Sequence, residues 1–224
     1  KDYLSEKNLV RASLLGALVT LMSVPRILLG GLQPAMFYVL AAFVSMTLVC
    51  GAVTAWGHNR GMGGVWPEKA RLGPSLTFAT LAGLALAAVH FLLLDLVFAR
   101  AIEETGNAAF MNLHYPETLS GCLALVLWTT GFETVFFYAA APSFIVRVTR
   151  RIWPAYVFAA ILRLMVTLHQ MGAAGIDEAG HLFAAGSIVT SFVTVLLFVR
   201  GGLPAAMLFT SVLNLRLFLD LPGG

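Results

Sequence analysis

Long apolar runs, separated by short polar or glycine-rich segments, divide the whole chain. A membrane-spanning helix needs about 20 predominantly apolar residues, and the successive runs approach or reach that length. The pattern therefore predicts an all-α fold, a polytopic transmembrane helical bundle of about seven spans. The expected spans cover residues 9–23, 34–56, 74–98, 119–146, 153–172, 181–199 and 203–219.

The first apolar run is the weakest of the series. It is short, carries Arg11 near its start, and is followed by Pro25 and Arg26, which we expect to end it. Arg11 can snorkel to the lipid headgroups. Two placements stay open. Either this run crosses the bilayer, or it lies in the interface, in which case the N-terminus changes sides while the other spans keep their orientation.

Composition agrees with a membrane protein. Of the 224 residues, 59% are hydrophobic and only 11% are charged, and the mean hydropathy is +0.86. Soluble domains carry about 25% charged residues. The net charge of +3 comes from basic residues in short loops, where it reports membrane topology, so we expect no nucleic-acid partner. Cys50 and Cys122 lie within apolar runs, which favours free, packed thiols over a disulfide.

Basic and acidic loops alternate along the chain. Segments 57–73, 147–152 and 200–202 are basic, whereas segments 100–116 and 173–180 are acidic. The positive-inside rule places the N-terminus and the basic loops in the cytoplasm. With seven spans, the C-terminus then lies on the opposite side.

Glu133 is the only acidic residue of the fourth apolar run and lies near its middle. A carboxylate at that depth costs at least ~2.5 kcal/mol and usually faces a bundle interior. Arg163 lies near the middle of the next run, and the short connection makes the two helices antiparallel neighbours. We therefore expect a Glu133–Arg163 ion pair. The alternatives are a structural carboxylate bonded to a nearby Thr or Trp, and an arginine that snorkels or binds backbone carbonyls.

Three further polar residues in the spans are candidates for chemistry. His169 follows Arg163 by about two turns, and Thr210 and Asn214 lie in the last run. Each has a structural alternative: a packed histidine, a threonine bonded to its own backbone, and an asparagine in an interhelical hydrogen bond.

A metal site is not favoured by the remaining candidates. His90, Asp95, Asp177, Glu178 and His181 all fall toward the acidic-loop side, but their spacings match no metal-binding motif. His90 and Asp95 are five residues apart, which places them on different faces of a helix. We predict no metal and no cofactor.

The residue order resembles the CAAX protease and bacteriocin-processing (CPBP) family of intramembrane proteases. That family carries Glu-Glu-x-x-x-Arg, Phe-x-x-x-His and His-x-x-x-Asn on three successive blocks. Segment 133–138 resembles the first block: Glu133 matches the first Glu, while Thr134 and Tyr138 replace the second Glu and the Arg.

The other two blocks lie in later spans. Met165 and His169 resemble the second block, with Met in place of Phe. Thr210 and Asn214 resemble the third, with Thr in place of His. The resemblance covers about the last hundred residues, one block each on the fourth, fifth and seventh expected spans.

The resemblance implies glutamate-type peptide hydrolysis within the membrane. Glu133 and His169 would activate a water, and Thr210 and Asn214 would stabilise the oxyanion. Arg163 would support Glu133 in place of the missing motif arginine. The implied substrate is a membrane-embedded or lipid-linked peptide, and the implied location is a prokaryotic cytoplasmic membrane.

The changed motif positions keep a rival hypothesis open. A non-catalytic subunit or scaffold of a membrane complex would use the same polar residues only to lock helices together. If the side chains of Glu133 and His169 both face one water-filled cavity, the protease is favoured. A Glu133–Arg163 contact with His169 facing elsewhere would favour the scaffold.

The expected organisation is one integrated membrane domain. Residues 1–116 would form three N-terminal spans, and residues 117–224 a four-span CPBP-like core. The expected partners are membrane lipids and either a membrane-anchored peptide substrate or neighbouring subunits. The first two spans would offer the docking surface, unless their small residues serve ordinary internal packing; these are Gly16, Ala17, Ala41, Ala42 and Gly51.

Overall fold

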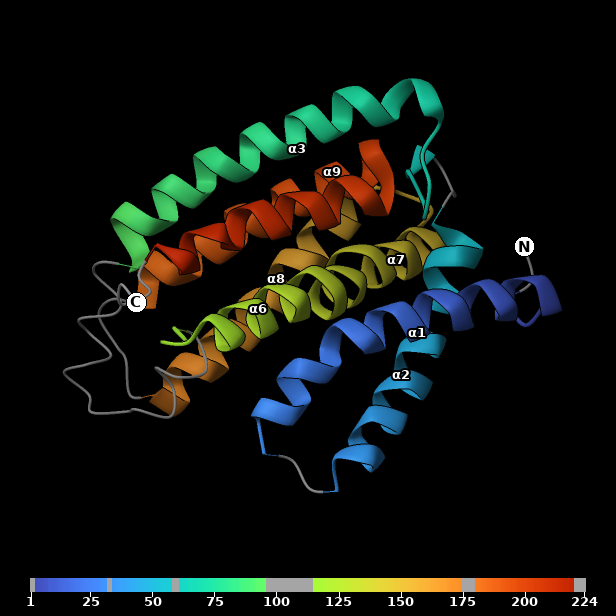
Figure 1. Cartoon of the computed structure of the whole chain (residues 1–224). Coiled ribbons are helices and arrows are strands. Elements are labelled where there is room, and N and C mark those ends of the chain that lie inside the picture. The colour runs from blue at the N-terminus through green and yellow to red at the C-terminus, as the bar shows by residue number, and fades with distance from the viewer. Residues whose placement is uncertain (1–2, 32–33, 58–60, 96–114, 175–179, 220–224) are drawn as a thin grey trace.

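Helices make up the described part of the chain (Figure 1). The computed structural model describes residues 3–31, 34–57, 61–95, 115–174 and 180–219, and these ranges contain no strand. The α-helices are α1 (Glu6–Leu29), α2 (Ala35–Trp56), α3 (Lys69–Val89), α6 (Leu119–Trp128), α7 (Ala141–Thr149), α8 (Trp153–Ala174) and α9 (Gly180–Asn214). Two π-helices, η2 (His90–Asp95) and η3 (Thr129–Ala140), and a 3₁₀ turn, η4 (Leu215–Phe218), complete them.

Six helical stretches among the described residues are long and apolar enough to cross a membrane. The chain is therefore an integral membrane protein, and the predicted all-α bundle is confirmed. The count by this criterion is six, not the expected seven or so. The difference arises because the expected sixth and seventh spans form one stretch, α9, inside which only Gly202 leaves helical geometry.

Gly202 nevertheless reverses the chain, so α9 consists of two arms, one before and one after this residue. Gly201 packs against Ser75 near the start of α3. Thr190 and Arg216, on either side of the turn, both reach η2 at the far end of α3. A straight helix would separate Thr190 from Arg216 by about 39 Å. The two arms must therefore run antiparallel to each other alongside α3.

The loop between α2 and α3 supports this reversal. The N–H of Gly63 donates to the carbonyl of Phe198 (3.3 Å), and the N–H of Leu203 donates to the carbonyl of Gly64 (2.9 Å). A Cβ on Gly63 would collide with the backbone of Gly202. The irregular backbone is thus satisfied by protein groups, the condition under which such backbone is tolerated in a membrane protein.

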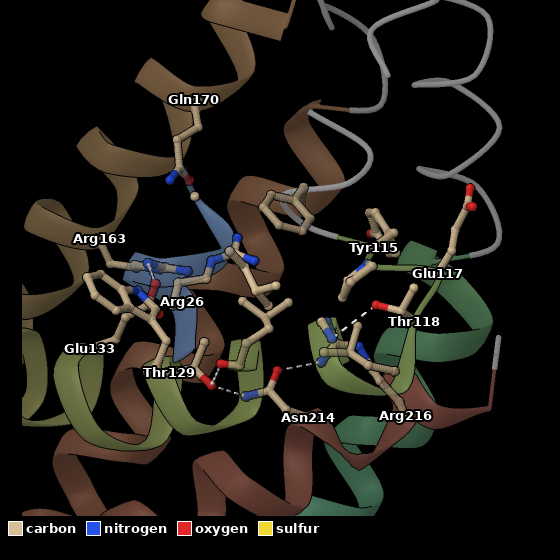
Figure 2. Close-up of a pocket in the computed structure, with 18 residues that line it drawn as sticks. Arg26, Tyr115, Glu117, Thr118, Thr129, Glu133, Arg163, Gln170, Asn214 and Arg216 are labelled. Carbon is tan, nitrogen blue, oxygen red and sulfur yellow. Dashed lines mark hydrogen bonds and ion pairs between the residues drawn. The ribbon is translucent and has the colours of Figure 1, made fainter. Parts of the chain in front are cut away.

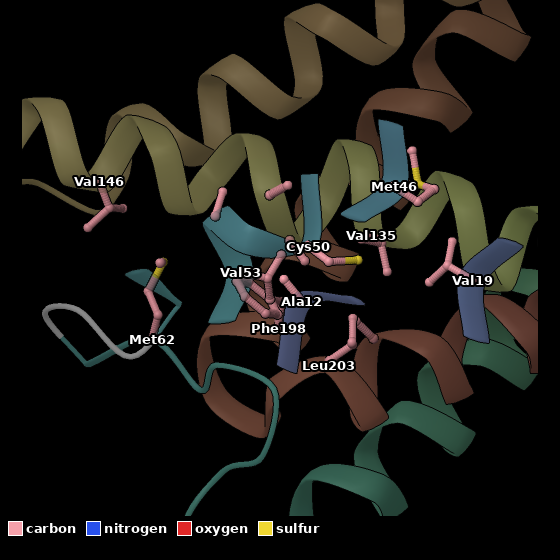
Figure 3. Close-up of a cluster of buried hydrophobic side chains, with 14 of the residues drawn as sticks. Ala12, Val19, Met46, Cys50, Val53, Met62, Val135, Val146, Phe198 and Leu203 are labelled. Atoms are coloured by element: carbon pink, nitrogen blue, oxygen red, sulfur yellow. The ribbon is translucent and has the colours of Figure 1, made fainter. Parts of the chain in front are cut away.

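The main core cluster joins early and late parts of the chain (Figure 3). Val19 of α1, Cys50 of α2, Val135 of η3 and Phe198 of α9 are all fully buried within it. Cys50 and Cys122 are buried and form no disulfide in the described part of the chain, as predicted from their apolar surroundings.

Helix α1 is longer than the first apolar run predicted. It continues through Pro25 and Arg26 to Leu29, so these two residues do not end it. Apolar residues after the proline continue the helical pattern, and a proline within a membrane helix is tolerated when other groups satisfy the freed carbonyl. The extension carries Arg26 to the candidate site.

Two of the small residues expected at a docking surface serve internal packing instead. A Cβ on Gly16 would meet Thr47 of α2, and a Cβ on Gly51 would meet the ring of Tyr3. These close approaches hold α1, and the segment just before it, against α2. Ala41, by contrast, remains on the exposed face of α2.

Candidate functional site

A cavity of about 780 Å³ lies at the end of the bundle that holds Gly30, Thr118 and Leu217, and it reaches inward to Glu133. Its walls come from α1, α6, η3, α8, α9 and η4 (Figure 2). The volume falls in the range of small-molecule sites. The polar side chains that line it include Arg26, Thr129, Glu133, Arg163, Gln170, Asn214 and Arg216, and apolar walls come from Leu29, Leu125, Trp128, Phe183 and Leu217.

The predicted ion pair lies at the inner part of this cavity. Arg163 Nη1 of α8 is 3.2 Å from Glu133 Oε1 of η3, and each side chain is 18% exposed. The guanidinium carbon of Arg163 is also 5.7 Å from the ring centre of Phe137. Arg26 of α1 lies beside Arg163 and interacts electrostatically with Glu133 (Figure 2). One carboxylate thus faces guanidinium groups from two different helices.

Glu133 lies on the π-helical segment η3, where the wider turn changes the side-chain spacing. The Thr134 hydroxyl donates to the carbonyl of Thr129 (2.9 Å), five residues earlier, which matches the π-helical spacing. Such segments often occur at functional positions. The departure from α-helical geometry ends just before Pro142, at Ala140.

A seam of hydrogen bonds joins η3 to the second arm of α9. The hydroxyls of Thr134 and Thr210 are 2.9 Å apart, as are those of Thr130 and Ser211. Thr210 Oγ1 also lies 3.0 Å from the carbonyl oxygen of Ala206, one turn earlier. Each hydroxyl has one proton, so the protons of Thr134 and Thr210 are used among these contacts inside the bundle. The two changed motif positions, Thr134 and Thr210, therefore lie against each other.

Asn214 is fully engaged within the bundle. Its Nδ2 donates to Thr129 Oγ1 (2.9 Å) and to the carbonyl of Thr210 (2.8 Å), while Oδ1 accepts from Arg216 Nη1 (3.3 Å). An amide has two N–H donors, so both are used. The expected role of Asn214 as an oxyanion donor is not met in this arrangement, although the residue borders the cavity.

His169 does not join Glu133, contrary to the expectation of a Glu/His pair. Its side chain is exposed on α8 and does not line the cavity. At about 100° per residue, His169 lies about 120° around the helix from Arg163, whereas Gln170 lies within about 20° of it. Gln170 accordingly shares the cavity with Arg163.

A second, more buried ion pair borders the cavity. Arg216 Nε is 2.7 Å from Asp95 Oδ2, with side chains 11% and 2% exposed. The Tyr115 hydroxyl donates to Asp95 Oδ1 (3.2 Å), and Arg216 Nη1 donates to the carbonyl of Leu213 (3.1 Å). This network fastens η2 to the C-terminal end of the second arm.

The other polar candidates are dispersed. His90 is buried and lies 3.4 Å from the hydroxyl of Thr190, and His181 is exposed. Asp177 and Glu178 lie outside the described residues. Among the described residues, no group of three or more His, Cys, Asp or Glu side chains is placed to hold a metal ion.

Sequence reasoning missed Arg26 and the Asp95–Arg216 pair. Arg26 was assigned to the end of a span because it follows Pro25, yet three apolar residues after it signalled that the helix continues. Asp95 and Arg216 are far apart in sequence, and only the reversal at Gly202 brings Arg216 back to η2.

Comparison of the chain with protein-family models, with curated proteins and with solved structures found no match. The CPBP resemblance therefore rests on the motif residues alone.

Proposed function

We propose that this chain is a non-catalytic, CPBP-like membrane protein that acts as a subunit or scaffold of a membrane complex, in a prokaryotic cytoplasmic membrane. The observation that carries the proposal is that neither His169 nor Asn214 is placed to act on a substrate in the cavity. The His169 side chain is exposed and does not line the cavity. Both N–H groups of Asn214 donate to groups inside the bundle. A general base and oxyanion donors must reach the reacting atoms.

In this proposal Glu133 is a structural carboxylate. It connects η3 to α8 through Arg163, and Arg26 of α1 adds a second positive charge beside it. Removing one partner of such a pair is strongly destabilising, because it leaves a charge uncompensated. The ion pair thus fixes the relative positions of helices that a partner subunit would recognise.

Cleavage and stability measurements on Glu133 and Arg163 variants test the proposal. We expect neither the unmodified chain nor Glu133→Gln to cleave a co-expressed, tagged membrane peptide. We also expect Glu133→Gln and Arg163→Gln to lower stability in detergent, with the double variant losing less than the sum of the two. Additive losses of stability would contradict a stabilising interaction between Glu133 and Arg163. Glu68→Gln, which alters an exposed pair with Arg71, is the matched control.

A second candidate function is intramembrane peptide hydrolysis. It is favoured by one observation: Glu133 lines a cavity large enough to hold water and a peptide segment. If the unmodified chain cleaves the tagged peptide and Glu133→Gln loses ~10²–10⁴-fold in rate, the hydrolase replaces the scaffold. Retained cleavage in His169→Ala would then show that another group assists Glu133.

A further inference from the structure

We propose that the cavity binds a phosphate oxyanion at Arg163, beside Arg26, and that the phosphate is the headgroup of an anionic phospholipid. This site goes beyond the scaffold role and does not depend on whether the protein cleaves peptides. Three of the charged residues that line the cavity are arginines, Arg26, Arg163 and Arg216, against Glu117 and Glu133.

Arg163 keeps most of its donor capacity. A guanidinium carries five N–H donors, and among the described residues the one ion-pair partner of Arg163 is Glu133. The buried Nη1 forms the ion pair with Glu133, at 3.2 Å, so this contact occupies one nitrogen of the guanidinium. Phe137 covers a face of the guanidinium, which leaves the in-plane N–H groups for acceptor oxygens.

A phosphate oxyanion matches this donor set. Guanidinium groups bind phosphate through paired, charge-assisted hydrogen bonds in the plane of the group. Arg26 adds a second positive charge from α1, and Gln170 adds an amide on the same face of α8 as Arg163. The Glu133 carboxylate competes with the phosphate for the Arg163 guanidinium, so Glu133 weakens phosphate binding.

The walls of the cavity indicate a lipid as the source of the phosphate. Helices α1 and α8 both pack against η3 but make little or no contact with each other. Leu29 of α1 lines the cavity and is 57% exposed. In a bilayer, an exposed leucine on a spanning helix is a position where lipid reaches the cavity. Apolar side chains of Trp128 and Phe183 line the cavity beside the charged groups, as an amphiphile requires.

The test is a titration of the purified full chain in detergent with fluorescent phosphatidylglycerol, with phosphatidylcholine for comparison. We expect saturable binding that favours phosphatidylglycerol. Arg163→Gln should weaken it about tenfold or more, the loss of a charge-assisted hydrogen bond. Glu133→Gln should tighten it, because the competing carboxylate is gone. Arg147→Gln removes an exposed charge from the basic segment 147–152, and it should leave the affinity for phosphatidylglycerol unchanged.

Two results would overturn the proposal: equal binding by the unmodified chain and Arg163→Gln, or weaker binding by Glu133→Gln. If Arg163→Gln does not fold, as judged by circular dichroism and gel filtration, the direction of the Glu133→Gln effect decides. Displacement of the lipid by inorganic phosphate would support the oxyanion site with a soluble source, and absence of displacement supports the lipid source.

Discussion

At the scale of single residues, burial decides which ion pairs matter. Asp95 and Arg216 are almost excluded from solvent, and their 2.7 Å contact is reinforced by Tyr115. The Arg71–Glu68 pair has side chains 61% and 77% exposed. Exposed pairs contribute about 0–1 kcal/mol, whereas breaking a buried pair leaves an uncompensated charge.

Asp95→Asn should therefore destabilise the protein by about 3 kcal/mol, because Arg216 loses its charge partner in a nearly dry contact. Denaturant unfolding in detergent micelles measures this. Glu68→Gln, at the exposed pair, should leave the unfolding midpoint nearly unchanged. Equal effects of the two variants would show that the Asp95–Arg216 pair does not anchor the second arm of α9.

Part of the candidate site could be predicted from the sequence at this scale. The depth of Glu133 and Arg163 in antiparallel neighbouring spans predicted their contact, and the structure contains it. The position of Gln170 was also predictable, since the helical period places Gln170, not His169, on the face of Arg163. The bonds of Asn214 could not be foreseen, because they depend on the register of η3 against α9.

At the scale of elements, one residue separates two arms of a hairpin. Gly202 has φ 68° and ψ −170°, a region open essentially to glycine alone. Sequence patterning predicted the break after Val199 correctly, but not that a single glycine makes the turn. The length and apolarity of a run do not encode the backbone angles at its end, nor the contact with the loop that holds Gly63.

Gly202→Ala should destabilise the hairpin by about 1–3 kcal/mol from backbone strain alone. The new Cβ would also press on Pro67 and on the carbonyl of Gly64. Thermal unfolding and yield in detergent measure the loss. Gly73→Ala is the matched control: its Cβ meets nothing within 4 Å, and alanine favours a helix over glycine. A neutral Gly202→Ala would refute the strained turn.

At the scale of the whole molecule, the basic segments converge on one end. The ring of Tyr3 lies 5.2 Å from that of Trp56, which lies 6.2 Å from that of Phe144. The ends of α1, α2 and α7 thus meet on the side of the basic connection 147–152. Because α6, η3 and α7 form one continuous helical stretch, Glu117 must lie at the opposite end.

This arrangement, with the positive-inside rule, predicts that residue 150 faces the cytoplasm and residue 117 faces the other side. Both side chains are exposed, so Arg150→Cys and Glu117→Cys suit labelling with a membrane-impermeant thiol reagent. In intact cells we expect label on Glu117→Cys alone, and on both after permeabilisation. The unmodified chain should stay unlabelled, because Cys50 and Cys122 are buried. Labelling of both variants in intact cells would mean that the 119–149 stretch does not cross the bilayer.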